Sequence, residues 1–388
     1  MMNTKELDNK YIAHSYGRFD VCLTQGKGSV LYDESGKKYI DFTSGIGVNS
    51  FGICDGIWKE AVEEQLGKVQ HTSNLYYTEP CAKLAELLCQ RSGMKNIFFA
   101  NSGAEANEGA IKFARKYSSD KYGEGRYNII TLTDSFHGRT ITTLAATGQE
   151  VFHKDFAPFT QGFKYCEANN IDELKKLATD DVCAIMFECI QGEGGVNNLS
   201  VEFINEIARL AEEKDILIVV DEVQTGNGRT GKYFAYQNYS ITPDIVTTAK
   251  GLGGGLPIGA VLFGEKLSDT VTPGSHGSTF GGNPIVAAGA ISIVERIDDK
   301  FLADVRAKGK YITDFVKNIK GVKDISGMGL MIGILTDKDA SDIAKECLAN
   351  GLLVLTAHKN KVRLLPALNI SYDEIDEGLK ILKEVIEK

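Results

Sequence analysis

The sequence contains no apolar run long enough to cross a membrane, and its start, MMNTKELDNK, lacks an apolar signal core. Its eight cysteines are scattered, without a CxxC pair or a His/Cys spacing typical of a metal site. The net charge of -9 is spread along the chain, so no basic block could follow a nucleic-acid backbone. We therefore expect a cytoplasmic protein with reduced thiols, no metal, no membrane contact and no nucleic-acid partner.

No internal repeat, low-complexity segment or linker rich in serine or proline divides the chain. Short β-like pieces occupy residues 1–45, and apolar strands then alternate with helical stretches to about residue 290, which favours a parallel sheet with crossover helices. The expected strands of this sheet are 96–100, 128–132, 184–187, 216–220, 245–248 and 260–263. The clearest expected helix spans 201–214, where apolar residues recur at helical spacing.

A second, smaller unit should follow an apolar helix at 284–297. We expect β-like runs at 330–335, 352–355 and 362–365 and a closing amphipathic helix at 372–387. The predicted division is an N-terminal segment at 1–45 that packs with the small domain, a large domain at 46–292 and a C-terminal small domain at 293–388.

Lys250 is the most informative residue, because it follows an apolar strand at 245–248 and precedes the glycine-rich run Gly251-Leu252-Gly253-Gly254-Gly255. The strand at 216–220 likewise ends on Asp221, and carboxyl ends of strands are where open α/β sheets bind ligands. Pyridoxal phosphate enzymes need a lysine that forms a Schiff base and an aspartate that keeps the pyridine nitrogen protonated. Each residue alone is also compatible with a solvated lysine or a helix N-cap, but the glycines favour a close backbone approach.

A second motif, Asn101-Ser102-Gly103-Ala104-Glu105-Ala106-Asn107, opens a helix directly after the strand at 96–100. The free N–H groups and the dipole of a helix N-terminus bind anions. The alternative is an ordinary N-cap, with Ser102 or Asn101 as the capping residue. Beside Lys250, we interpret the motif as a phosphate site.

Three further segments place aromatic or charged side chains near strand ends. Phe136 can stack on a pyridine face, or it can simply be a core residue. Arg139 can hold a carboxylate through two parallel hydrogen bonds, or it can form a surface ion pair. His137, between them, is assigned no task. Glu193 lies among glycines, where a solvated turn is the alternative, and Arg363 is a charge within an apolar run, typical of a paired or ligand-binding residue.

Together these motifs resemble the class III, fold type I aminotransferases, which use pyridoxal phosphate, and within them the acetylornithine aminotransferase subgroup. The resemblance covers nearly the whole chain in order and spacing, through HTSNLYY, NSGAEANE, FHGRT, QGEGGV, DEVQTGNGRTG, AKGLGGGLPIGA, GSTFGGNP and RLLPAL. It implies an α/β fold in which a large domain with a mostly parallel sheet flanked by helices is joined to a smaller α+β domain. Two stretches depart from the family: Gly52-Ile53-Cys54-Asp55-Gly56 replaces Gly-His-x-His-Pro, and Glu188-Cys189 replaces Glu-Pro.

The resemblance implies roles for the cofactor-binding residues. Lys250 matches the Schiff-base lysine and Asp221 the partner of the pyridine nitrogen. The other matches are the ring-stacking Phe136, Val223 on the opposite ring face, Gln224 at the phenolic oxygen, the phosphate loop Ser102, Gly103 and Ala104, and Ser278 and Thr279 near the phosphate of the neighbouring subunit. A homodimer with active sites at the subunit interface is therefore expected.

The resemblance also implies a substrate. Arg139 matches a carboxylate clamp, and Glu193 and Arg363 match a pair that opens for glutamate; Tyr16 and Ile46 are further expected substrate contacts. The implied reaction moves the δ-amino group of N2-acetyl-L-ornithine to 2-oxoglutarate, giving N-acetyl-L-glutamate 5-semialdehyde and L-glutamate for arginine biosynthesis. Aliphatic Ile46 disfavours free ornithine, because ornithine δ-aminotransferases tend to have tyrosine there. Succinyl-diaminopimelate, acetyl-lysine, 4-aminobutyrate and putrescine stay open as donors, as does a non-catalytic cofactor-binding relative.

Overall fold

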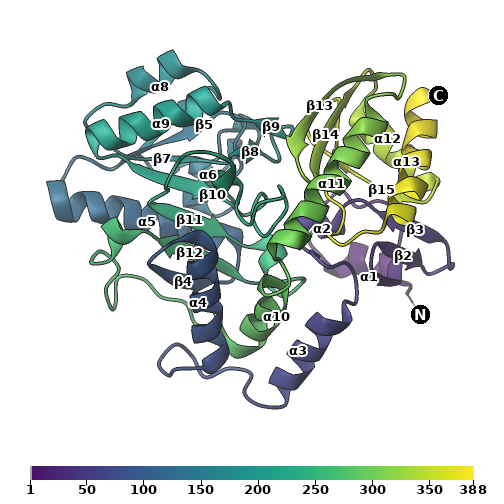
Figure 1. Ribbon diagram of the computed structural model, residues 1–388, viewed down its shortest axis with the longest axis horizontal. Coiled ribbons are helices and arrows are strands. Elements are labelled where there is room, and N and C mark those ends of the chain that lie inside the picture. Colours follow the sequence, from purple (N-terminus) through teal and green to yellow (C-terminus); the bar gives the residue numbers. More distant parts are fainter. Residues whose placement is uncertain (1) are drawn as a thin grey trace.

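The computed structural model describes residues 2–388 and consists of a larger and a smaller body (Figure 1). The first helix, α1 (Thr4–Tyr11), and the last, α13 (Tyr372–Glu387), both belong to the smaller body, on the right of the view. Helix α11 (Asp299–Val316) follows α10 (Pro284–Val294) and leads the chain from the larger body into the smaller one.

A seven-stranded sheet forms the centre of the larger body. Its order is β4 (Asn96–Ala100), β12 (Gly259–Phe263), β11 (Ile245–Thr248), β10 (Leu217–Asp221), β7 (Val182–Phe187), β5 (Asn128–Leu132) and β6 (Phe163–Cys166). The predicted mostly parallel sheet is confirmed, since only β12 runs antiparallel to its neighbours. All six residues of β7 are buried, which explains its continuous apolar sequence.

Helices cover both faces of this sheet, as its parallel crossovers require (Figure 1). The predicted helix at 201–214 is confirmed as α9 (Val201–Lys214), whose buried residues are Phe203, Ile204, Ile207, Leu210 and Ala211. Helix α5 (Gly103–Tyr122) packs on β11 and β12, and α10 packs on α3 (Gly56–Leu66) and α4 (Glu79–Ser92). The shorter elements are α2 (Ser44–Gly47), α6 (Ile141–Ala146), α7 (Glu150–His153), α8 (Ile171–Leu177), β8 (Ile190–Gln191) and β9 (Asn197–Asn198).

The smaller body holds two four-stranded sheets. One joins β1 (Leu23–Lys27), β2 (Val30–Asp33), β3 (Lys38–Asp41) and β15 (Leu352–Leu353); the other joins β13 (Val322–Met328), β14 (Met331–Thr336), β17 (Lys361–Leu364) and β16 (Leu355–Thr356). Helices α11, α12 (Ala340–Ala349) and α13 share one hydrophobic core with both sheets. The single strand predicted at 352–355 is wrong: the run divides at buried Val354 and its halves join different sheets, a change of direction that an unbroken apolar run does not reveal.

The segment that departs from the family at residues 52–56 leads into α3. Asp55 caps the helix by accepting a hydrogen bond from the Trp58 N–H at 2.9 Å, and its carboxylate lies 2.8 Å from the Arg296 guanidinium. Gly52 has a φ of 78°, and a Cβ there would lie 2.6 Å from the Gly28 carbonyl oxygen, so the close approach of these two backbones requires glycine. An aspartate cap and an ion pair therefore anchor this helix.

Across residues 2–388, no helix is long and apolar enough to cross a membrane. The same residues contain no group of three or more His, Cys, Asp or Glu side chains that could hold a metal ion.

Candidate active site

A cavity of about 430 Å³ opens at the edge of the central sheet where the parallel strands end. It gathers predicted residues from loops that are far apart in sequence. Those lining it are Ser102, Gly103, Ala104, Phe136, Arg139, Asp221, Val223, Gln224 and Lys250. The structure thus brings the expected phosphate loop, ring-stacking residues, acid and amine to one place.

Lys250 is held in a strained backbone conformation, with a φ of 43°. The glycine-rich turn after it is fixed from two sides, because the Gly251 carbonyl accepts a hydrogen bond from Ser50 Oγ at 2.8 Å and the Gly253 carbonyl accepts one from Trp58 Nε1 at 3.1 Å. Burial lowers the pKa of Lys250, although the carboxylates of Glu193 and Asp221 act in the opposite direction. A larger share of this amine is therefore unprotonated near neutral pH than in an exposed lysine.

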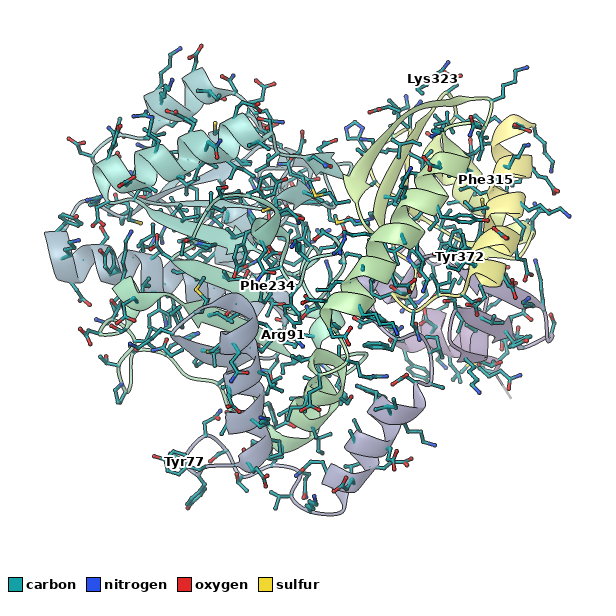
Figure 2. All side chains as sticks on the ribbon, in the orientation of Figure 1. Tyr77, Arg91, Phe234, Phe315, Lys323 and Tyr372 are labelled. Atoms are coloured by element: carbon teal, nitrogen blue, oxygen red, sulfur yellow. The ribbon has the colours of Figure 1, made fainter. Side chains whose placement is uncertain are left out.

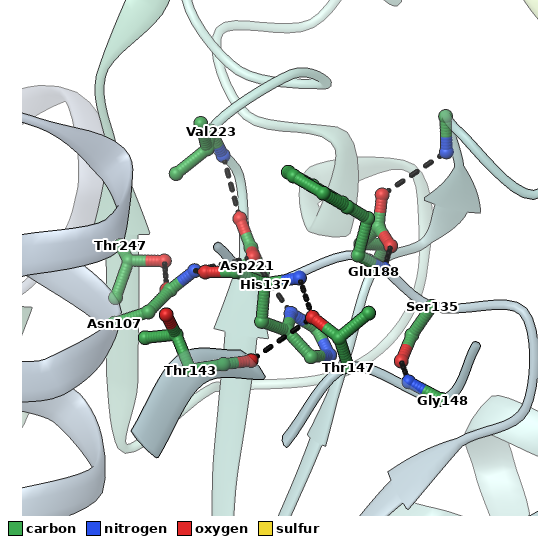
Figure 3. A network of polar contacts seen from close by, with 12 residues as sticks. Asn107, Ser135, His137, Thr143, Thr147, Gly148, Glu188, Asp221, Val223 and Thr247 are labelled. Carbon is green, nitrogen blue, oxygen red and sulfur yellow. Dashed lines mark hydrogen bonds and ion pairs between the residues drawn. The ribbon is translucent and has the colours of Figure 1, made fainter. Parts of the chain in front are cut away.

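Asp221 is buried at the base of this cavity and its carboxylate accepts three hydrogen bonds (Figure 3). Asn107 Nδ2 donates to Oδ2 at 2.7 Å, His137 Nδ1 lies 2.8 Å from the same oxygen, and the Val223 N–H donates to Oδ1 at 2.9 Å. These partners fix the position of the carboxylate. The arrangement suits a protonated ring nitrogen as a further partner.

Two of these partners, Asn107 and His137, were missed by the sequence reasoning. Asn107 lies on the buried face of α5 and accepts a hydrogen bond from Thr247 Oγ1 at 2.7 Å, while His137 is buried and its backbone N–H donates to Thr147 Oγ1 at 2.9 Å. The His137 Nε2 atom is buried without a hydrogen-bond partner among the described residues. One available signal was the polar residue Asn107 on a buried helix face otherwise rich in alanine.

The turn before α5 has features of both an ordinary N-cap and an anion site, the two interpretations that the sequence left open. Ser102 Oγ caps the helix by accepting from the Glu105 N–H at 3.1 Å, and the N–H groups of Gly103 and Ala104 donate to no group among residues 2–388. They are available to an anion at the positive end of the helix. A Cβ on Gly103 would lie 2.7 Å from Val223 Cγ1, so glycine is what allows this turn to approach Val223.

These features fit pyridoxal phosphate. The turn at 102–104 would hold the phosphate, and the fixed Asp221 carboxylate would meet the pyridine nitrogen. Phe136 and Val223, which both line the cavity, would face the ring. Lys250 supplies an amine with no hydrogen-bond partner among the described residues.

Arg363 and Glu193 form an ion pair beside this cavity. Arg363 Nη1 donates to Glu193 Oε1 at 2.9 Å and to Gln224 Oε1 at 3.0 Å, and its Nε is buried without a partner among the described residues. Although burial opposes it, the Arg363 charge lowers the pKa of Glu193. Gln224 therefore links the ion pair to the cavity that contains Lys250.

Arg139 differs from Arg363 because it makes no ion pair with any of residues 2–388. Its guanidinium is exposed and makes no hydrogen bond to residues 2–388; it lies 3.9 Å from the centre of the Phe152 ring and 5.6 Å from that of Phe136. Its in-plane N–H groups are therefore open to a carboxylate.

Besides Glu193 and Arg363, which lie beside this cavity, four predicted residues do not line it. Tyr16 and Ile46 are both exposed, and Ile46 has a φ of 64° within α2. Ser278 and Thr279 line a neighbouring cavity of about 440 Å³, which shares Asn101 with the first, and Asn101 Nδ2 donates to Ser278 Oγ at 3.3 Å. Their expected contact with a neighbouring subunit stays a prediction.

Glu188 is a further lining residue to which the sequence reasoning gave no role. Its carboxylate accepts hydrogen bonds from the N–H groups of Phe136 and Gly192, each at 3.0 Å, and so joins the loop of Phe136 to the loop of Glu193. Burial raises the pKa of Glu188 to about 7, and the charge of Asp221 adds to the rise.

A larger cavity, about 780 Å³, lies elsewhere, between α11 and β13. Its lysines at 310 and 317 are both paired with Asp314, at 2.6 and 2.7 Å. Because these charges satisfy one another at the surface, we assign no chemistry to this cavity.

Comparison with known proteins agrees with the geometry of the site. The sequence profile of the class III aminotransferases matches residues 11–386. The chain is 52% identical to the acetylornithine aminotransferase of Haemophilus ducreyi over 98% of both chains. Its structure is similar to N-acetylornithine aminotransferase from Stenotrophomonas maltophilia, with a TM-score of 0.85, 36% identity and coverage of 98% and 97% of the two chains.

A second solved structure, an ornithine aminotransferase from Toxoplasma gondii with pyridoxal phosphate partly occupying its active site, has a TM-score of 0.94 to this chain. Identity is 28%, and the similarity covers 99% of this chain and 94% of that one. The chain therefore belongs to the class III aminotransferases, enzymes that depend on pyridoxal phosphate and move an amino group from a donor to a keto acid.

Proposed function

We propose that the enzyme transfers the δ-amino group of N2-acetyl-L-ornithine to 2-oxoglutarate and acts as a homodimer. One observation favours a donor with a single carboxylate: of the two arginines at the site, Arg139 makes no ion pair with residues 2–388 and Arg363 is paired with Glu193. A donor with one carboxylate needs one free arginine, and glutamate, with two carboxylates, needs both. The relatives named acetylornithine aminotransferase, at up to 52% identity, support the same donor.

Asp221 and Lys250 have different roles in the proposed amino transfer. When bound, pyridoxal phosphate supplies an aldehyde that condenses with amines and a ring that takes up electrons. Asp221, fixed by Asn107 and His137, would hold a proton at the ring nitrogen. Lys250 Nζ, whose pKa is lowered by burial, would take a proton from the substrate carbon that bears the amine and deliver it to the cofactor carbon that carried the aldehyde.

Arg139 would hold the α-carboxylate of acetylornithine and the distal carboxylate of glutamate through charge-assisted hydrogen bonds. The Arg363–Glu193 pair keeps the second arginine neutralised while the monocarboxylate donor is bound. Opening the pair would expose Arg363 to the second carboxylate of glutamate or 2-oxoglutarate. One site thereby accepts two substrates of different charge in turn.

The dimer is supported by an exposed apolar surface next to Ser278 and Thr279. Leu75 is 85% exposed, Tyr76 71%, Tyr77 106% and Phe280 59%, and Figure 2 shows Tyr77 directed away from the body on the loop before α4. Apolar patches of this kind mark interaction surfaces. Light scattering after gel filtration should give twice the 42.3 kDa chain mass; a monomer with full activity would contradict the dimer.

A panel of amino donors, each with 2-oxoglutarate, tests the substrate. We expect acetylornithine to give the highest kcat/KM, measured as glutamate formed. Preference for putrescine, which has no carboxylate for Arg139, would overturn the assignment while leaving the aminotransferase class intact.

A further inference from the structure

We infer that Phe152 is a positioning residue that holds the Arg139 guanidinium ready for a substrate carboxylate. The inference rests on the proposed role of Arg139 as the clamp. Phe152 itself is not among the residues lining the cavity, so its effect must pass through its neighbour.

The contact is close and well oriented. The central guanidinium carbon of Arg139 lies 3.9 Å from the centre of the Phe152 ring, a distance at which the cation rests on the ring. The same ring meets Phe136 edge to face, with centroids 5.9 Å apart and planes at 81°. Phe152 therefore contacts both the expected clamp and the expected ring-stacking residue.

An aromatic contact positions Arg139 for a substrate carboxylate better than an ion pair would. A carboxylate partner would occupy the in-plane N–H groups of Arg139 and cancel its charge, whereas an aromatic face leaves both available. Arg139 makes no hydrogen bond to residues 2–388, and the Phe152 ring is nearer to its guanidinium than the Phe136 ring, so Phe152 restricts its rotamers more than Phe136 does. A substrate carboxylate then meets an arginine that has already lost part of its conformational entropy.

The segment that carries Phe152 is itself anchored to the Phe136 loop. The Gly148 N–H donates to Ser135 Oγ at 3.0 Å, and Gln149 Nε2 donates to the Ser135 carbonyl at 3.0 Å. At the other end of α7, His153 Nε2 lies 2.8 Å from the Leu144 carbonyl oxygen. These contacts fix the position of the ring.

The test measures binding of glutarate, a dicarboxylate without a reactive amine or keto group, to the cofactor-loaded enzyme by calorimetry. Phe152→Leu should weaken binding by about three- to fivefold, the size of a partly exposed cation–π contact, and Phe152→Tyr should restore it. In Arg139→Ala, adding Phe152→Leu should cause no further loss. Phe156→Leu, a change of the same kind at an exposed phenylalanine four residues away, should have no effect.

The binding measurements distinguish the positioning role of Phe152 from the proposed role of Arg139 as the clamp. Unchanged glutarate affinity in Phe152→Leu, or equal losses from Phe152→Leu with and without Arg139, would overturn the positioning role. Unchanged affinity in Arg139→Ala would instead overturn the clamp and with it the proposed substrate recognition. Thermal unfolding of each variant shows whether it is folded, and if Phe152→Leu is not, Phe152→Met provides the same comparison.

Discussion

His137 Nδ1 lies 2.8 Å from Asp221 Oδ2, and both side chains are buried. The histidine comes from the loop after β5 and the aspartate from the end of β10, so their contact joins two parallel strands at the edge of the sheet that forms the site. With Asn107 donating to the same oxygen, Asp221 has little freedom to rotate.

Lys250→Ala should abolish measurable turnover while the protein stays folded, because loss of a positioned acid–base group alone costs roughly 100- to 10,000-fold. Contacts to the phosphate and the ring do not depend on this amine, so some cofactor should still bind. Mass spectrometry after borohydride reduction of the unmodified enzyme should find the pyridoxyl group on Lys250. A label on another lysine would contradict the assignment.

Asp221→Asn should retain the cofactor but lower turnover by at least about 100-fold, because an amide cannot hold a ring proton by charge. The absorbance spectrum of the bound cofactor should also become more sensitive to pH, which reports the ring nitrogen independently of activity. Near-normal rates would mean that a different acid serves the nitrogen.

Much of the fold was predictable because the apolar residues of its helices and strands follow clear sequence patterns. The α9 helix shows apolar residues at helical spacing between a serine cap and a polar end, and β7 is an unbroken apolar strand. The β15–β16 division was not predictable, since every residue from Leu352 to Leu355 is apolar and only tertiary pairing distinguishes the halves. The domain limits at residues 45 and 292 stay a prediction.

Some residues of the site could also be predicted from sequence patterns, whereas others are revealed only by the fold. Lys250 and Asp221 could be selected because each follows an apolar strand. His137 could not, because its importance lies in a contact with Asp221 across 84 residues of sequence. Asn107 could be noticed as a polar residue on a buried helix face, but its partner Asp221, 114 residues away, could not. Phe152 likewise gains a role only through the fold that brings its ring against Arg139.

Arg139→Ala and Arg363→Ala should differ in the half-reactions that they impair. Loss of Arg139 should damage both half-reactions, since each substrate loses a charge-assisted contact worth about 1.5 to 3 kcal/mol. Loss of Arg363 should chiefly damage the half-reaction with glutamate. Single-turnover spectroscopy can follow the cofactor with each substrate separately, and equal losses in both halves for Arg363→Ala would contradict the switch.

Glu222→Gln should stabilise the enzyme increasingly as pH rises from about 4.5 to about 7. Glu222 is fully buried, where its carboxylate accepts hydrogen bonds from Thr225 Oγ1 at 2.6 Å and the Tyr236 N–H at 2.8 Å, and burial raises its pKa from 4.5 to about 7. Between these values the folded protein keeps a proton that the unfolded chain has lost, so the wild type loses stability as pH rises through this window. Above pH 7 the loss levels off.

Glutamine does not ionise, and its amide can accept from Tyr236 and donate to Thr225, so the variant avoids this loss. Its advantage should reach up to about 3 kcal/mol, at about 1.4 kcal/mol for each pH unit. Melting temperatures of both proteins from pH 5 to pH 8 measure it, with exposed Glu202→Gln as the matched control. A difference that does not change with pH would show that Glu222 ionises in the folded protein as easily as in the unfolded chain, and that its hydrogen bonds offset the cost of burial.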